Sequence, residues 1–270
     1  MQVIAEIAMG HDGSLGTALA YVQACAYAGV DGVKLQCHTG DPRTKLRPGV
    51  WLPQDENCQA YLKRTSFNDH EWCQIAEACE KFGIDFIVSP FSMAAFEQMQ
   101  RVGVDRWKIG SAQVTNHELI DACVGTGKPV ILSSGMSTWE ELHAAIERMQ
   151  GVQLTILQCT SQYPCPPEKI GLQWARNHQD WFPGIGLSDH SGQIWPSIAA
   201  AVLGLEMVEV HVVFSRECFG PDVSSSITLD ELKQLVRGVR FIESMGLDQE
   251  HDKEAMASEL AGMREVFRGA

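Results

Sequence analysis

Two histidines at the ends of predicted strands are the first candidates for chemistry. His190 follows the apolar segment 184–188, and His211 lies in the apolar segment 207–214. A strand of a barrel gains nothing from ending in histidine, whereas neutral imidazole is the commonest metal ligand in proteins. We therefore interpret the pair as a metal site. The alternative is that each is a solvated or hydrogen-bonded loop histidine.

Two lysines and a set of small hydroxyl residues point to an anionic ligand. Lys34 and Lys108 each lie inside an apolar segment, where a lysine costs several kcal/mol of desolvation unless an anion meets it. Hydroxyl residues recur at the ends of other predicted strands, namely Ser89, Ser111, Ser133, Ser134, Thr160, Ser161 and Ser188. Hydroxyls can ring a phosphate while lysine supplies charge. Either lysine alone could instead snorkel to a barrel end.

Two carboxylates accompany these groups. Glu6 interrupts the first apolar segment, and Glu209 lies two residues before His211. A carboxylate near a metal can ligate it, orient a water or act as general acid or base. For Glu6, a salt bridge to a neighbouring lysine inside the barrel is an equal alternative.

The elements that must position these residues alternate along the chain. Strand patterns lie at 3–8, 32–37, 84–89, 106–111, 129–134, 154–159, 184–188 and 207–214. Helical patterns lie at 14–28, 69–82, 92–102, 116–125, 138–149, 168–179, 194–204 and 228–245. This alternation predicts an α/β fold, a single-domain (β/α)8 TIM barrel. The competing doubly wound open sheet usually stops at about six strands.

Length and composition agree with this architecture. The chain has 270 residues and is 45% apolar, close to the typical barrel of about 250 residues. We assign 1–249 to the barrel and 250–270 to a C-terminal helical tail. The stretch 38–66 is irregular and rich in proline, glycine and charge, which is typical of a lid or binding loop, or else of disorder.

Charge and cysteine usage exclude several classes of protein. A formal net charge of −13 argues against nucleic-acid and anionic-membrane partners but not against a small anionic substrate. Nine scattered cysteines without a CxxC pair indicate neither a disulfide framework nor a structural zinc cluster. With no basic leader and no long apolar run, we expect a cytoplasmic protein.

Short motifs along the chain also carry a resemblance. They are Ala5-Glu6-Ile7, His11-Asp12-Gly13, Val33-Lys34-Leu35-Gln36, Ser89-Pro90-Phe91, Lys108-Ile109-Gly110-Ser111, Ser133-Ser134-Gly135-Met136, Cys159-Thr160-Ser161, Tyr163-Pro164, Ser188-Asp189-His190 and Gly220-Pro221-Asp222. In this order they resemble the sialic acid synthase (N-acetylneuraminate synthase) family over nearly the whole chain. The resemblance implies condensation of phosphoenolpyruvate with an N-acetylhexosamine-type aldehyde, using a divalent metal, usually Mn²⁺ or Mg²⁺.

The resemblance also implies roles for single residues. The metal ligands would be His190 and His211. Phosphoenolpyruvate would be held by its carboxylate on Lys34, Ser89 and Lys108, and by its phosphate on Ser111, Ser133, Ser161 and Ser188. The sugar would face Gln36, Tyr163 and Asp222, while Glu6 and Glu209 stabilise or move charge and protons. The metal would polarise the aldehyde oxygen, C3 of the enol would attack, and water would add at C2 before phosphate leaves.

Four departures from the family pattern bear on activity. Gln113 stands where members usually carry glutamate, Gln158 where they carry histidine, and Val210 where they carry a basic residue. An amide such as that of Gln113 cannot exchange a proton as a carboxylate does. Most members also add an antifreeze-like domain that caps a partner's active site. We expect the stretch 38–66 to replace that cap, with a second subunit or a separate capping protein as the alternatives.

The leading interpretation is a transferase, a phosphoenolpyruvate-dependent synthase of a sialic-acid-like 2-keto acid sugar. One alternative is a metal-dependent aldolase or lyase on the same barrel. The other is a non-catalytic barrel that binds phosphoenolpyruvate or sugar. The intact lysines and histidines favour turnover, whereas Gln113 and the absent cap favour its loss. The sequence leaves the acceptor sugar, the metal and the oligomeric state, including a homodimer, open.

Overall fold

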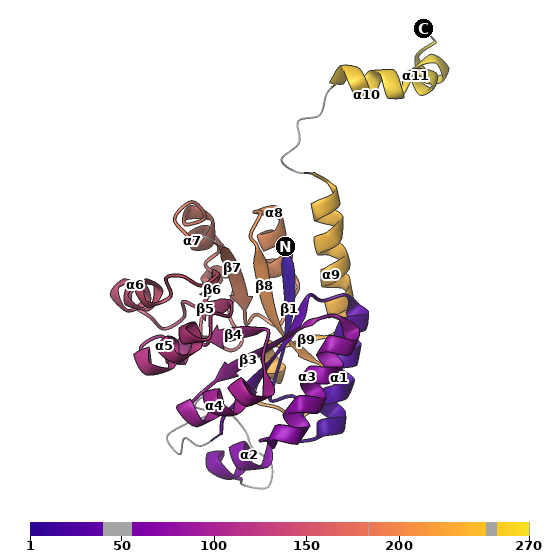
Figure 1. Cartoon of the computed structure of the whole chain (residues 1–270). Helices are drawn as coiled ribbons and strands as arrows, with labels where there is room; N and C mark the ends of the chain where they lie inside the picture. The colour runs from indigo at the N-terminus through magenta and orange to yellow at the C-terminus, as the bar shows by residue number, and fades with distance from the viewer. Residues whose placement is uncertain (40–55, 183, 247–252, 270) are drawn as a thin grey trace.

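Eight parallel strands close into a ring. The structure is a computed structural model that describes residues 1–39, 56–182, 184–246 and 253–269. The strands are β1 (Gln2–Ala8), β2 (Gly32–Cys37), β3 (Asp85–Pro90), β4 (Arg106–Ile109), β5 (Val130–Ser133), β6 (Leu154–Cys159), β7 (Ile185–Asp189) and β8 (Met207–Val213). They pair in chain order, and β1 also pairs with β8 (Figure 1). The predicted TIM barrel is confirmed, because an open sheet would leave two edge strands unpaired.

The crossover segments between strands are helical. The helices are α1 (Leu15–Ala28), α2 (Cys58–Arg64), α3 (Asp69–Phe82), α4 (Met93–Val102), α5 (His117–Gly125), α6 (Trp139–Arg148), α7 (Leu172–Asn177), α8 (Trp195–Val202) and α9 (Leu229–Ser244). Side-chain caps fix the N-termini of three helices, α3, α6 and α9. Asn68, Thr138 and Thr228 each form a capping box with the glutamate three residues later, which satisfies backbone N–H groups that have no partner within the helix. A short strand, β9 (Ile227–Thr228), pairs with β8 just before α9.

The helix predicted over 168–179 is shorter than expected. The 3-10 turn η3 (Pro167–Lys169) occupies its start, and α7 begins only after Gly171, whose φ is +80°. Left-handed backbone interrupts a right-handed helix. The prediction was therefore wrong at this end of the segment.

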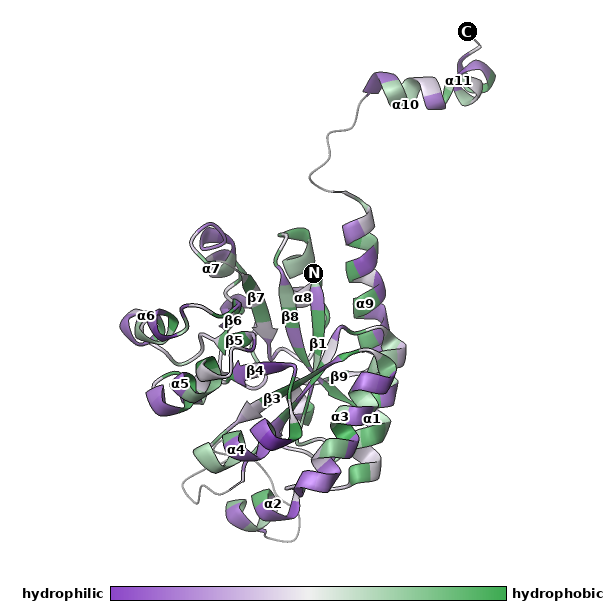
Figure 2. Cartoon of the chain, in the orientation of Figure 1, coloured by the Kyte–Doolittle hydropathy of each residue, from purple (hydrophilic) through white to green (hydrophobic). Residues whose placement is uncertain are grey.

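Alternation along the strands divides the barrel into an apolar floor and a polar upper layer. One inward-facing cluster consists of Ile4, Ile87, Ile131, Leu157 and Met207. Two residues further along their strands, the inward positions become polar or sulfur-bearing, in order Glu6, Ser89, Ser133, Cys159 and Glu209. Outward residues pack against the helices in the main core, and Figure 2 shows that these helices carry both hydrophobic and hydrophilic residues. The fold thus gathers polar groups at the carboxyl ends of the strands.

Part of the stretch 38–66 is ordered as a helix rather than irregular. Helix α2 begins after Asn57, whose side chain accepts from the N–H of Ala60. Its buried Tyr61 and Leu62 pack with Met9. This tertiary contact stabilises a helix too short to be stable alone, so the irregular prediction was wrong for residues 58–64. The lid expected between 38 and 66 otherwise falls largely on residues 40–55, which lie outside the described residues.

The C-terminal segment contains two short helices, α10 (Lys253–Glu259) and α11 (Ala261–Arg268). None of the side chains in these two helices is buried. None of the helices in the described ranges is both long and apolar enough to cross a membrane.

Candidate active site

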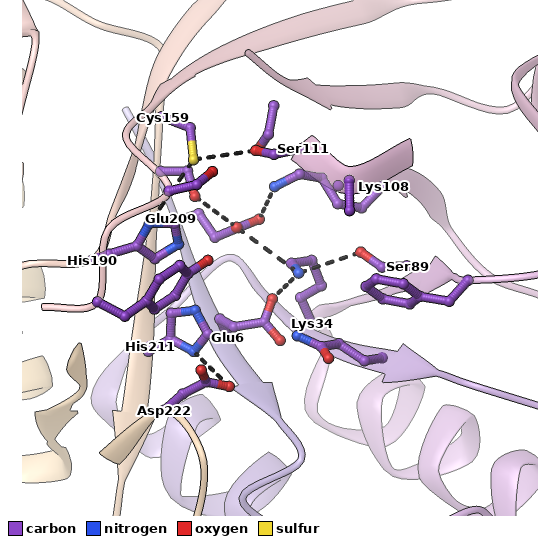
Figure 3. Close-up of a pocket in the computed structure, with 18 of the residues that line it drawn as sticks. Glu6, Lys34, Ser89, Lys108, Ser111, Cys159, His190, Glu209, His211 and Asp222 are labelled. Carbon is purple, nitrogen blue, oxygen red and sulfur yellow. Dashed lines mark hydrogen bonds and ion pairs between the residues drawn. The ribbon is translucent and has the colours of Figure 1, made fainter. Parts of the chain in front are cut away.

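A cavity of about 240 Å³ opens at the carboxyl ends of the strands (Figure 3). The residues to which the family resemblance gives a role all line it: Glu6, Lys34, Gln36, Ser89, Lys108, Ser111, Ser133, Ser161, Tyr163, Ser188, His190, Glu209, His211 and Asp222. Ser134 and Thr160 of the wider hydroxyl set do not line it. They come from all eight strands or the loops that follow them. This convergence follows from the barrel, because parallel strands bring their carboxyl ends to one face.

The centre of the cavity holds two lysines and two glutamates in alternation. Lys34 Nζ forms an ion pair with Glu6 and lies 3.9 Å from Glu209 Oε1, while Lys108 Nζ donates to Glu209 Oε2 at 2.5 Å. Ser188 Oγ donates to Glu209 Oε1 at 3.0 Å. All five side chains are buried. The alternative reading of Glu6, a salt bridge inside the barrel, is therefore part of the arrangement.

The environment shifts the pKa values of this cluster. Burial raises the pKa of Glu209, but the charges of Lys108 and Lys34 outweigh burial and bring it to about 2. Burial lowers the pKa of Lys34 to about 8, although Glu209 opposes that shift. Glu209 is thus a carboxylate at neutral pH, and Lys34 stands close to its titration point.

The two histidines lie side by side at the rim of this cluster. Their ring centroids are 5.3 Å apart, and the ring of Tyr163 lies 4.0 Å from that of His190. His190 Nδ1–H donates to the carbonyl of Thr160 at 2.9 Å, which leaves the Nε2 lone pair for a ligand. Burial lowers the pKa of His211 to about 3, so this imidazole is neutral.

These donors fit a divalent metal. Asp222 Oδ2 lies 4.0 Å from His211 Nδ1 and supplies a nearby carboxylate. Over the described ranges, no group of three or more histidine, cysteine, aspartate or glutamate side chains is arranged to hold an ion. The two imidazoles are the described side chains that would ligate an ion here, and substrate and water oxygens would complete its shell.

A hydroxyl-lined part of the cavity lies beside Gly135, two residues after the end of β5, and is called the Gly135 hollow; Ser111, Ser133 and Ser161 line it. A Cβ built at this glycine would lie 2.4 Å from Ser161 Oγ, 2.6 Å from Ser111 Oγ and 3.0 Å from Cys159 Sγ. Ser161 Oγ is buried without a hydrogen-bond partner. A buried unpaired hydroxyl is costly, so the hollow suits an anion that would accept from these groups.

Cys159 and His38 line the cavity but were not predicted for the site. Cys159 could have been found, because it follows Leu157 by two positions on the inner face of β6. Its thiol accepts from Ser111 Oγ at 3.4 Å and lies 3.9 Å from His190 Nδ1. Burial raises its pKa, but the contact with His190 outweighs burial and brings it to about 7. That contact in turn raises the pKa of His190 against the effect of burial.

The three residues that depart from the family pattern, Gln113, Gln158 and Val210, do not line the cavity. Gln113 Oε1 accepts from Asn116 Nδ2 at 2.8 Å, at the start of α5. Gln158 donates to the carbonyl of Ile170 at 3.3 Å, and Val210 packs in the outer core. The amide of Gln113 therefore does not replace a carboxylate that faces this cavity.

Comparison with known proteins agrees with this geometry. The profile of the NeuB family matches residues 21–251. The chain belongs to the NeuB family. Among its relatives are pseudaminic acid synthase of Campylobacter jejuni, 31% identical over 255 residues, and human N-acetylneuraminate-9-phosphate synthase, 28% identical over 251 residues. The alignments cover 90% and 89% of this chain and 74% and 70% of those proteins.

Solved structures with a similar barrel fold agree with the family assignment. The crystal structure of N-acetylneuraminic acid synthetase from Leptospira borgpetersenii, in complex with citrate, superposes with a TM-score of 0.84 at 27% identity. The match covers 98% of this chain and 92% of that chain. A 3-deoxy-D-arabino-heptulosonate 7-phosphate synthase from Thermotoga maritima shares the fold alone, with a TM-score of 0.69 at 15% identity.

Proposed function

We propose that this enzyme is a transferase that condenses phosphoenolpyruvate with an aldose to give a sialic-acid-like 2-keto acid sugar. Relatives named as pseudaminic acid and N-acetylneuraminate-9-phosphate synthases support this reaction class. The observation that carries the proposal is one cavity that joins an anion hollow at Gly135, two buried lysines and a histidine pair. A polyanionic substrate and a polarisable aldehyde need these groups side by side.

Phosphoenolpyruvate would span the inner part of the cavity. Its carboxylate would lie on Lys34, Lys108 and Ser89, and Lys34 Nζ already donates to Ser89 Oγ at 3.4 Å. Its phosphate would lie in the Gly135 hollow, with hydroxyls from Ser111, Ser133 and Ser161 as donors, and Ser188, whose O–H is held by Glu209 Oε1, would lie beside it. Charge-assisted hydrogen bonds of this kind are roughly twice as strong as neutral ones. Buried hydroxyls with no partner inside the protein gain most from such a ligand.

We assign the divalent cation, Mn²⁺ or Mg²⁺, to His190 and His211. The Thr160 carbonyl fixes the His190 tautomer, and the neutral His211 ring keeps a lone pair. When bound, the cation would polarise the aldehyde oxygen of the sugar. Gln36, Tyr163 and Asp222 would hold the remaining polar groups of the acceptor.

The condensation forms one carbon–carbon bond and releases phosphate. C3 of phosphoenolpyruvate attacks the aldehyde carbon, and water adds at C2. The C2–oxygen bond to phosphate then breaks, leaving a ketone, and the two protons of the water pass to the aldehyde oxygen and to the leaving phosphate. Both oxygens of Glu209 are occupied by Lys108 and Ser188, so its role is to hold these donors in place. Glu6 has no hydrogen-bond partner among the described residues beyond its ion pair with Lys34, which leaves it free to accept a proton from the attacking water.

The experiment that tests this proposal is phosphate release from phosphoenolpyruvate across a panel of aldoses, with and without Mn²⁺. We expect release only when both an aldose and the metal are present, together with a new sugar acid in the mass spectrum. Cleavage of a sialic-acid-type sugar without phosphoenolpyruvate would favour an aldolase or lyase instead. Binding of phosphoenolpyruvate without turnover for any aldose would favour a non-catalytic barrel.

A further inference from the structure

His38 lines the cavity directly after β2 and contacts Gln36, a residue assigned to the sugar. It follows the end of β2 by one residue, and its Nε2 lies 2.9 Å from Gln36 Oε1. Its ring stacks on Phe91, with centroids 4.2 Å apart and planes inclined by 25°. All three side chains line the cavity. His38 is thus fixed by a stacking contact on one side and a hydrogen bond on the other.

The chemistry of the pair sets the direction of the hydrogen bond. Burial lowers the pKa of His38 to about 4, and Asp222 only partly opposes this shift, so the ring is neutral at pH 7. A neutral imidazole carries one N–H. Nδ1 of His38 is buried with no partner, and an unpaired buried N–H is rarer than an unpaired acceptor. The proton therefore belongs on Nε2, which donates to Gln36 Oε1.

This hydrogen bond decides which end of the Gln36 amide is left for a ligand. An amide has one carbonyl oxygen and one NH2 group. With the oxygen held by His38, the amide cannot flip without losing that bond. The two N–H donors of Gln36 are the groups left to face a bound sugar.

We propose that His38 is a positioning residue that locks the Gln36 amide with its NH2 group toward the acceptor. The site thereby selects an aldose that presents a hydroxyl or acyl carbonyl oxygen to Gln36. This inference rests on the proposed function and deepens it, because it concerns recognition of the acceptor and not of phosphoenolpyruvate.

Two variants separate the hydrogen bond from the stacking contact. His38→Phe keeps a ring against Phe91 and removes both nitrogens, whereas His38→Gln places an N–H donor near the position of Nε2. With N-acetylmannosamine as the acceptor probe, we expect His38→Phe to raise its KM about tenfold, the loss that one neutral hydrogen bond typically causes. The KM for phosphoenolpyruvate should stay within about twofold of the parent, and His38→Gln should restore most of the acceptor affinity.

Combination with Gln36→Ala tests whether His38 acts through Gln36. If it does, His38→Phe should add almost nothing in the Gln36→Ala background, since effects along one chain of contacts are not additive. Fully additive effects, or equal KM increases for both substrates, would overturn the proposal.

A measurement without turnover distinguishes this inference from the proposed function. NMR relaxation of the Gln36 side-chain amide nitrogen should give a high order parameter in the parent and in His38→Gln, and a lower one in His38→Phe, where the amide is free to turn about the Cγ–Cδ bond. If no aldose supports phosphate release yet the amide is locked as described, the function fails while the positioning stands. An amide that is equally mobile in the parent and His38→Phe would contradict the positioning whatever the activity.

Discussion

Gly135→Ala places one methyl group among the polar side chains that line the hollow assigned to the phosphate. The new carbon would lie 2.4 Å from Ser161 Oγ and 2.6 Å from Ser111 Oγ, closer than real contacts allow. Both hydroxyls end flexible side chains, so they would rotate away rather than force the backbone to move. The backbone itself accepts alanine, because Gly135 is not among the described glycines with positive φ.

The expected loss follows from the two displaced donors. A hydrogen bond to a charged group contributes about 1.5–3 kcal/mol, and each 1.4 kcal/mol is roughly tenfold in affinity. Loss of both donors should weaken phosphoenolpyruvate binding by about 100-fold to 10,000-fold. Overpacking costs about 1–3 kcal/mol of stability, and the stiffer unfolded chain returns about 0.4–1 kcal/mol. The Tm should therefore fall by less than about 10 °C.

Calorimetric titration with phosphoenolpyruvate measures the first effect and a thermal melt the second. Gly125→Ala is the matched control, because a Cβ at Gly125 meets nothing within 4 Å and its backbone lies at the end of α5. The control should bind phosphoenolpyruvate like the parent. Parent-like binding by Gly135→Ala, in a folded protein, would refute the assignment of the phosphate to this hollow.

Three further predictions concern the metal, the lysines and pH. His190→Ala and His211→Ala should each abolish metal-dependent turnover while the circular dichroism spectrum is retained, because residues at this face serve chemistry more than packing; bound metal measured after gel filtration would be unchanged if the histidines are structural. Lys108→Met should raise the KM for phosphoenolpyruvate and lower kcat, since it removes a cation opposite an anionic ligand and leaves Glu209 buried without its closest partner; identical calorimetric binding would make Lys108 merely structural. Because burial lowers the pKa of Lys34 to about 8, the cation is present below that pH and lost above it, so phosphoenolpyruvate affinity should fall by up to about tenfold per unit above pH 8. Lys34→Arg, which stays protonated, should flatten that fall, and a parent profile that is flat from about pH 7 to 9.5 would contradict the shift.

Local sequence signals account for most of the fold. The strands predicted at 32–37 and 154–159 match β2 and β6 at both ends. The signals that predict them, the run of apolar residues and the turn residues that bound it, lie within a few residues of each strand. Helix α2 escaped prediction, since its stability depends on the contact of Tyr61 and Leu62 with Met9. No local pattern carries that contact.

The candidate site was predictable as a set of strand ends but not as a set of contacts. Once the strands are parallel and closed, His190, His211 and Lys34 must share one face. The hollow at Gly135 and the bond between His38 and Gln36 depend on the relative stagger of neighbouring strands and on loop conformation. These are tertiary quantities, and the sequence pattern does not contain them.

In the proposed reaction, phosphate leaves phosphoenolpyruvate by cleavage of its carbon–oxygen bond during condensation at this cavity. Turnover with Mn²⁺ and an accepted aldose in water enriched in a heavy oxygen isotope tests it directly by mass spectrometry. Water that adds at C2 would place the heavy isotope in the sugar acid and leave the released phosphate unlabelled. Heavy isotope in the phosphate would show attack at phosphorus, and phosphate release without a sugar acid would show hydrolysis without condensation; either result would contradict this reaction.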